Sequence, residues 1–336
     1  MQEKELLKIK SLCEDSIRDF LQFNHNENKV FMPNEIFDDL HRKFNTLFPE
    51  DHEKNGAVGS HVAFTYSYVY FIAWLHRYCK YSDTWITTNG IKKCLRYSPT
   101  TKTIDFIIKK NGVLDDLGYT LTTTNYPIYW TFEDQDLQFV TVSDLDEVDK
   151  QYITQKLRNY KVKFPVKQFY RDRESYEEGI IDGAYYEVYN THMIDFEVFM
   201  FCMGEKDLGC TGFYLYSYLK MMNDQFKNGF DVALADLTHQ TKIKDRTLDK
   251  YLKSLKKYRM INCIHNQDYY VSGLSKEERK ANTYQTNEYT FFSNEPVKVK
   301  NIESMRLQDY RKWKTEKEEI NNRDIDGEVA NLPFNF

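Results

Sequence analysis

The stretch from Phe230 to Ile264, FDVALADLTHQTKIKDRTLDKYLKSLKKYRMINCI, decides the fold prediction for this chain of 336 residues. It predicts an apolar entry, a helix over 233–240, a turn at 241–243, a second helix over 245–258 and a strand at 260–264. Asp245 is the residue type that caps a helix N-terminus, so we expect it to begin the second helix.

The second of these helices is amphipathic, and its polar face is basic. The residues at helical spacing that we expect it to bury are Leu248, Tyr251, Leu252 and Leu255. The window 242–259 carries a local charge of +6 and the window 92–110 carries +5, in a chain of net charge −5. The remainder is acidic, most densely at 133–149. This polarisation suits a protein that presents selected elements to a polyanion, although charge runs are also commonly solvated helix faces.

An earlier stretch has the same layout. From Trp85 to Tyr119 the sequence WITTNGIKKCLRYSPTTKTIDFIIKKNGVLDDLGY predicts a helix over 88–96 and a basic helix over 99–111, opened by Ser98 and Pro99. A hairpin of 120–125 with the strand 128–132 is expected to follow. Each stretch comes after a strong helix, 64–80 or 211–227. Matching positions lie 143 to 147 residues apart, which we interpret as an internal duplication.

The stretch 230–264 resembles a winged helix-turn-helix, and the earlier copy resembles it more loosely through Ser98-Pro99-Thr100-Thr101. Two such modules in one acidic chain resemble the replication initiators of plasmids and phages of low-GC bacteria, and the regulators related to them. The resemblance covers 85–132 and 211–292. It implies a mainly α (α+β) fold with two winged helix-turn-helix modules, small β-hairpin wings and extra helices. It also implies sequence-specific binding of double-stranded DNA, in replication initiation or transcription regulation of a plasmid, phage or other mobile element.

The exposed side of each basic helix supplies the candidate DNA contacts. Short polar or basic side chains in the first turn of a helix in the major groove reach base edges, whereas later basic residues bind phosphates. In the second copy the base-reading candidates are Lys244, Arg246, Thr247 and Lys250, and the phosphate-binding candidates are Lys253, Lys256 and Lys257. In the first copy the candidates are Thr100, Thr101, Lys102 and Asp105. The wing would add His265, Asn266 and Gln267, with Lys276, Arg279 and Lys280 beyond them.

Other classes of function stay open at this stage. Winged helices also dock proteins, so an interaction module is one alternative, with the acidic segment 133–149 as part of the contact. An effector-sensing regulator, with the aromatic N-terminal region lining a pocket, is another. A homodimer or a replication or transcription protein partner is compatible with the DNA-binding hypothesis.

The sequence carries no motif for catalysis, cofactor binding or metal binding. It contains no P-loop, no GxGxxG and no GxSxG, and its histidines and cysteines form no pairs at metal-ligand spacing. We therefore expect a protein that is not an enzyme and that has no cofactor and no metal. No uncharged apolar run approaches the 18 or so residues of a membrane span, and no signal peptide opens the chain, so we expect a cytoplasmic location without membrane contact.

We expect five segments along the chain. They are a helical region at 1–60, the first module at 61–135, a connector at 136–192, the second module at 193–293 and a charged tail at 294–336. Further helices are expected over 1–23, 33–47, 143–159 and 301–320, followed by a disordered 321–336. In the second module we expect strands at 269–271 and 288–292, separated by a long wing loop at 275–287.

Overall fold

The computed structural model describes residues 3–49, 57–133, 136–156, 160–168, 190–275 and 277–330. Helices predominate in these ranges, and the strands form small sheets of two or three, antiparallel apart from one short pair. The predicted mainly α (α+β) class is therefore confirmed. No described helix has the length and apolar character needed to cross a membrane.

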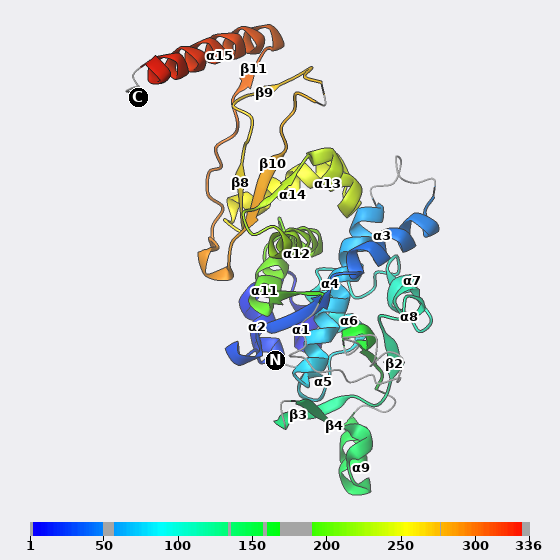
Figure 1. Ribbon diagram of the computed structural model, residues 1–336. Coiled ribbons are helices and arrows are strands. Elements are labelled where there is room, and N and C mark those ends of the chain that lie inside the picture. The colour runs from blue at the N-terminus through cyan, green and yellow to red at the C-terminus, as the bar shows by residue number, and fades with distance from the viewer. Residues whose placement is uncertain are drawn as a thin grey trace.

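Residues 3–168, here the first half, contain most of the short elements (Figure 1). Their helices are α1 (Glu3–Lys8), α2 (Glu14–Leu21), α3 (Ile36–Leu47), α4 (Ala57–Arg77), α5 (Lys80–Thr84), α6 (Thr88–Cys94), α7 (Asp105–Ile108), α8 (Val113–Asp116) and α9 (Glu147–Lys156). Their strands are β1 (Lys29–Pro33), β2 (Leu121–Thr123), β3 (Pro127–Glu133), β4 (Asp136–Thr141) and β5 (Val162–Phe164).

Residues 190–330, the second half, begin at the centre of the molecule and end in a helix that stands apart from the body (Figure 1). Their helices are α11 (Phe196–Gly204), α12 (Gly209–Gln225), α13 (Leu234–Thr241), α14 (Asp245–Lys257) and α15 (Leu307–Ala330). Their strands are β6 (Thr191–Asp195), β7 (Phe230–Val232), β8 (Ile261–Ile264), β9 (Tyr270–Val271), β10 (Asn282–Thr286) and β11 (Ser304–Met305).

The two halves meet through a helix pair and a strand pair. Helices α4 and α12 pack together, with the Tyr66 ring 5.8 Å from Phe213 and the Tyr70 ring 4.7 Å from Phe213. Tyr66 and Phe213 are 147 residues apart, within the spacing of the sequence repeat. Strands β1 and β6 pair antiparallel with Phe31 opposite Met193. The pairing of β1 with β6 has an offset of 162 residues at its central pair, outside the spacing of the sequence repeat, so the duplication stays a prediction. One continuous core joins both halves.

His192 is a buried polar group at this junction. It lies on β6 and is 1% exposed. Its Nε2 accepts a hydrogen bond from the Tyr66 hydroxyl, with 2.7 Å between nitrogen and oxygen. Its Nδ1 lies 2.9 Å from Asn34 Oδ1, an acceptor, so Nδ1 carries the proton. Burial, with Lys220 as a smaller cause, lowers the pKa of His192 to about 3. The site therefore holds a neutral imidazole.

Acid should destabilise the fold through this histidine. The native pKa of His192 lies below the unfolded value of about 6.5. Between these two pKa values the imidazole is protonated in the unfolded chain but neutral in the native chain. The stabilisation is complete above pH 6.5 and is lost as the pH falls below it, at a cost of about 2 kcal/mol at pH 5. We expect urea unfolding at pH 7.5 and pH 5.0 to show this loss, and His192→Gln to reduce it. If the free energy of unfolding had the same pH dependence in the parent and in His192→Gln, a lowered pKa of His192 would be contradicted.

The expected helix over 1–23 is wrong, because the chain breaks into α1 and α2. The break lets the two pieces pack on different partners, α1 on α6 and α2 on α11. Glu3 shows why α1 separates. Its Oε1 accepts hydrogen bonds from Thr87 Oγ1 at 2.6 Å and from the Gly90 N–H at 3.0 Å, so the N-terminal residues hold the first turn of α6.

The expected helix over 99–111 is also wrong, since only Asp105–Ile108 is helical as α7. The cause is the buried ammonium of Lys92, which donates to Thr101 O at 2.6 Å and to Asp105 Oδ1 at 2.5 Å. A buried charge needs such partners, and these fix residues 98–104 as turns. Thr100, Thr101 and Lys102 therefore lie on a turn between α6 and α7 rather than on a recognition helix.

Several strand partners also differ from expectation. Segment 120–125 does not pair with 128–132, because β2 pairs with β5 and β3 pairs with β4. In the second half the expected wing loop 275–287 contains a strand, β10, which pairs with β8, and β9 in the expected strand 269–271 pairs with β11 in parallel. Residues 288–292 contain a 3₁₀ turn at Tyr289–Phe291 rather than a strand.

Two helix ends are also corrected. Lys244, rather than Asp245, is the N-cap of α14. Helix α15 runs to Ala330, beyond the expected end at 320, so the predicted disorder is wrong for 321–330, while 331–336 lie outside the described residues. The other predicted helices, over 33–47, 64–80, 88–96, 211–227, 233–240 and 245–258, are confirmed with shifted ends, and 143–159 is confirmed over Glu147–Lys156.

Candidate nucleic-acid interface

Helix α14 has one buried face and one exposed face, as its periodicity predicts. Leu248, Leu252 and Leu255 are 0%, 4% and 0% exposed, and they belong to the common core against which α12 and α13 also pack. A helix of 13 residues fixed along its apolar side holds its opposite side in a defined direction. The position of α14 therefore depends on the core and not on the charged residues.

The turn between α13 and α14 is held from both sides. Lys242 adopts the left-handed region at φ 59°, and Thr238 Oγ1 donates to Asp245 Oδ1 at 2.7 Å across the turn. Gly59 of α4 lies against this turn, so closely that a Cβ at Gly59 would sit 2.7 Å from Lys242 O. The first half thus packs directly against the turn between α13 and α14. Burial lowers the pKa of Lys242.

The predicted residues on α14 form one basic surface. Arg246, Thr247, Lys250, Lys253 and Lys257 are exposed, and Lys244 is half-buried at the N-cap. Lys253 pairs with Asp249 at 2.6 Å, but both side chains are about half exposed. Such an exposed pair contributes little stability, so Lys253 can exchange this carboxylate for a phosphate at little cost.

The wing follows β8 and returns through β10, in a sheet with the strand order β7-β10-β8. His265 Nδ1 lies 3.1 Å from Asn282 Oδ1, and Asn266 Nδ2 donates to Ala281 O and Thr283 Oγ1, both at 2.8 Å. The Asn266 amide therefore helps to close the wing, which sequence reasoning did not anticipate. Arg279 is exposed and donates to Leu274 O, whereas Lys276 lies outside the described residues.

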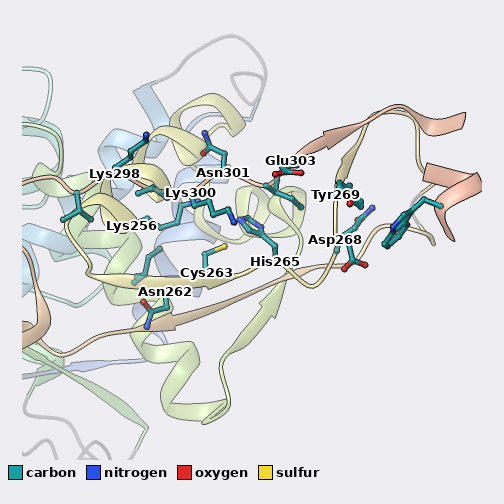
Figure 2. Close-up of a pocket in the computed structure, with 16 residues that line it drawn as sticks. Lys256, Asn262, Cys263, His265, Asp268, Tyr269, Lys298, Lys300, Asn301 and Glu303 are labelled. Carbon is teal, nitrogen blue, oxygen red and sulfur yellow. The ribbon is translucent and has the colours of Figure 1, made fainter. Parts of the chain in front are cut away.

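Sequence reasoning missed the strap, the extended segment 293–303, which runs back along the wing. Val297 N donates to Lys257 O and Tyr270 N donates to Glu303 O, both at 2.8 Å. The strap closes one side of a cavity of about 640 Å³ beside β8, where Lys256, His265, Lys298 and Lys300 lie together (Figure 2). The alternation Val297-Lys298-Val299-Lys300 is the signal that could have revealed it, because period two is typical of extended chain.

Comparison with family models, with curated proteins and with solved structures found no match to this chain. Within the described ranges, no three histidine, cysteine or carboxylate side chains gather as metal ligands would. The interpretation of the site therefore rests on its geometry and charge.

Proposed function

We propose that this chain is a sequence-specific, non-enzymatic double-stranded DNA-binding protein whose reading element is α14. The observation that carries the proposal is the basic surface of α14, presented by a helix whose opposite face is fixed in the core. Arg246, Thr247 and Lys250 lie in its first two turns, where side chains of a major-groove helix reach base edges. Lys253 and Lys257 follow them at positions suited to phosphates.

The second half supports a winged helix-turn-helix module around this helix. The order α12, β7, α13, α14, β8, β10 places two short helices at a fixed turn beside a three-stranded sheet, with the wing between β8 and β10. The strap adds Lys298 and Lys300 to the same basic side of β8. We propose phosphate contacts for the wing and strap, which would set the register of α14 on the duplex.

The biological output that we propose is replication initiation or transcription regulation of a mobile element, the two roles implied by the family resemblance. Both require recognition of a particular duplex. The first half, with Thr100, Thr101 and Lys102 on the turn before α7, would add a second DNA contact or a surface for a second copy or a protein partner.

Binding to duplex fragments from the gene's own neighbourhood, followed by fluorescence anisotropy over a salt series, tests the proposal. About six phosphate contacts would give a slope of about −5 in log affinity against log salt. We expect one fragment to bind tightly and a shuffled duplex of the same length and composition to bind much more weakly. Equal binding of both duplexes, or a slope near zero, would refute site-specific recognition.

A protein-docking function has one specific observation in its favour. Tyr129 of β3 and Val148 and Tyr152 of α9 are 60%, 76% and 66% exposed, at the end of the molecule opposite α15 (Figure 1). Large apolar side chains exposed to this extent are one mark of interaction surfaces. Failure of every duplex in the anisotropy experiment would favour this second function.

A further inference from the structure

The first basic window does not form a recognition helix but lines a cavity. The cavity has a volume of about 630 Å³ and lies among α6, α7, β2 and β5. Among the described residues, its lining holds one acidic residue, Asp105, and five lysines: Lys92, Lys109, Lys110, Lys161 and Lys163. Asp115 pairs with Lys163 behind this lining, so the local excess is three positive charges, and such an excess in a chain of net charge −5 requires an explanation.

Two of these lysines are fixed by the fold. The side chain of Lys92 is 5% exposed and pairs with Asp105 at 2.5 Å, and that of Lys163 is 8% exposed and pairs with Asp115 at 2.6 Å. Lys163 Nζ also donates to Lys109 O at 3.3 Å. Buried charges are stable only with such partners, so these two ammonium groups are preorganised parts of the cavity wall.

The other three lysines of the lining are exposed to solvent. Lys109, Lys110 and Lys161 are exposed while lining the cavity, which places them at its solvent side. Ammonium groups on long flexible stems attract phosphate as point charges and can close around it. The solvent side of the cavity is therefore suited to a multiply charged anion.

The inner wall has the opposite character. It is formed by the buried apolar and aromatic side chains of Tyr68, Tyr81, Ile86, Ile91 and Ile108. Thr122 also lines the cavity, and its buried Oγ1 has no hydrogen-bond partner among the described residues. That oxygen is also inaccessible from the cavity, so the wall that a bound molecule would meet is apolar.

We propose that this cavity binds a nucleotide, with its phosphates among the exposed lysines and its base against the aromatic and aliphatic wall. The volume lies within the range of small-molecule sites, and an apolar wall with a few convergent polar groups is the usual composition of such sites. Inorganic phosphate would use only the lysines, and a duplex would use only the outer charges, so a nucleotide matches more of the cavity than either.

Titration of the full chain with ATP carrying a fluorescent methylanthraniloyl group tests the proposal. We expect saturable binding that unlabelled ATP reverses and that inorganic phosphate reverses only at much higher concentration. The variant Lys109→Ala/Lys110→Ala/Lys161→Ala should bind at least about 10-fold more weakly, since it removes three charge-assisted contacts. The matched charge-removing control, Lys250→Ala/Lys253→Ala/Lys257→Ala on α14, also removes three exposed lysines and should bind the probe as the parent does.

The triple arginine variant at the same three positions should retain binding, and circular dichroism should show a native helix content for each variant. No saturable binding up to millimolar probe, or equal binding by the triple alanine variant and the parent, would overturn the proposal. So would displacement of the probe by duplex DNA with loss of binding in the α14 control. The DNA-binding proposal is tested separately, because it fails only in the duplex titration.

Discussion

Replacing Arg246 and Lys250 together by alanine is expected to weaken binding to the specific duplex by about 100-fold or more. Each bidentate contact to a base edge provides about 1–3 kcal/mol of discrimination, and about 2.8 kcal/mol corresponds to 100-fold. Both side chains are exposed and stand on the first two turns of α14, opposite Leu248 and Leu252. The substitutions leave the buried face intact, so we expect the free energy of unfolding to stay within about 0.5 kcal/mol of the parent value.

A second variant separates recognition of base edges from electrostatic attraction to the phosphates. Lys298→Ala/Lys300→Ala removes two charges from the strap. The slope of log affinity against log salt should become less negative by about 2, while the preference for the specific fragment persists. In the α14 double variant the preference itself should disappear. If Arg246→Ala/Lys250→Ala keeps both its affinity and its preference in the anisotropy titration, α14 is not the reading element.

Substituting Trp74 by alanine is expected to cost about 3–5 kcal/mol of stability. Trp74 of α4 is fully buried, and its ring stacks on Phe196 at 3.9 Å between centroids and 7° between planes. Its Nε1–H donates to Glu27 O at 2.6 Å. Because Phe196 begins α11, this contact joins the first half to the second, and its loss leaves a cavity where the two halves meet.

The free energy of unfolding from urea denaturation, followed by circular dichroism, measures this effect. Trp74→Phe keeps an apolar ring but leaves the Glu27 carbonyl without its donor, so we expect a smaller loss of roughly 1–3 kcal/mol. Trp313→Ala is the matched control, because Trp313 lies on the largely exposed helix α15, where it packs on Tyr310 and on Tyr269. A loss for Trp74→Ala no larger than that for Trp313→Ala would contradict the assigned role of the contact.

The second basic helix could be predicted because its signal is local. Leu248, Leu252 and Leu255 repeat at the period of a helix and are buried, whereas Tyr251, which we also expected to be buried, is half-buried. The candidate residues Arg246, Thr247 and Lys250 follow from the same periodicity, since they occupy the opposite face of α14. Thus the sequence was enough to propose a basic surface and its orientation relative to the core.

The first basic window could not be predicted in the same way, although its composition is similar. Ser98 and Pro99 are typical of a helix start, and residues 99–111 carry a helical pattern. The buried ammonium of Lys92, however, takes the Thr101 carbonyl as a partner. The cost of burying that charge exceeds the small propensity for helix, so a tertiary contact decided the local structure.

By itself the sequence determined the mainly helical class and the two-faced helix α14, because period and charge pattern are properties of neighbouring residues. Only the tertiary structure decided the strand partners, the strap beside the wing and the cavity lined by the first basic window. Each of these depends on contacts between residues far apart in the chain, such as Val297 with Lys257 and Lys163 with Asp115. No local preference specifies such contacts, because they form only when a shared core brings the segments together.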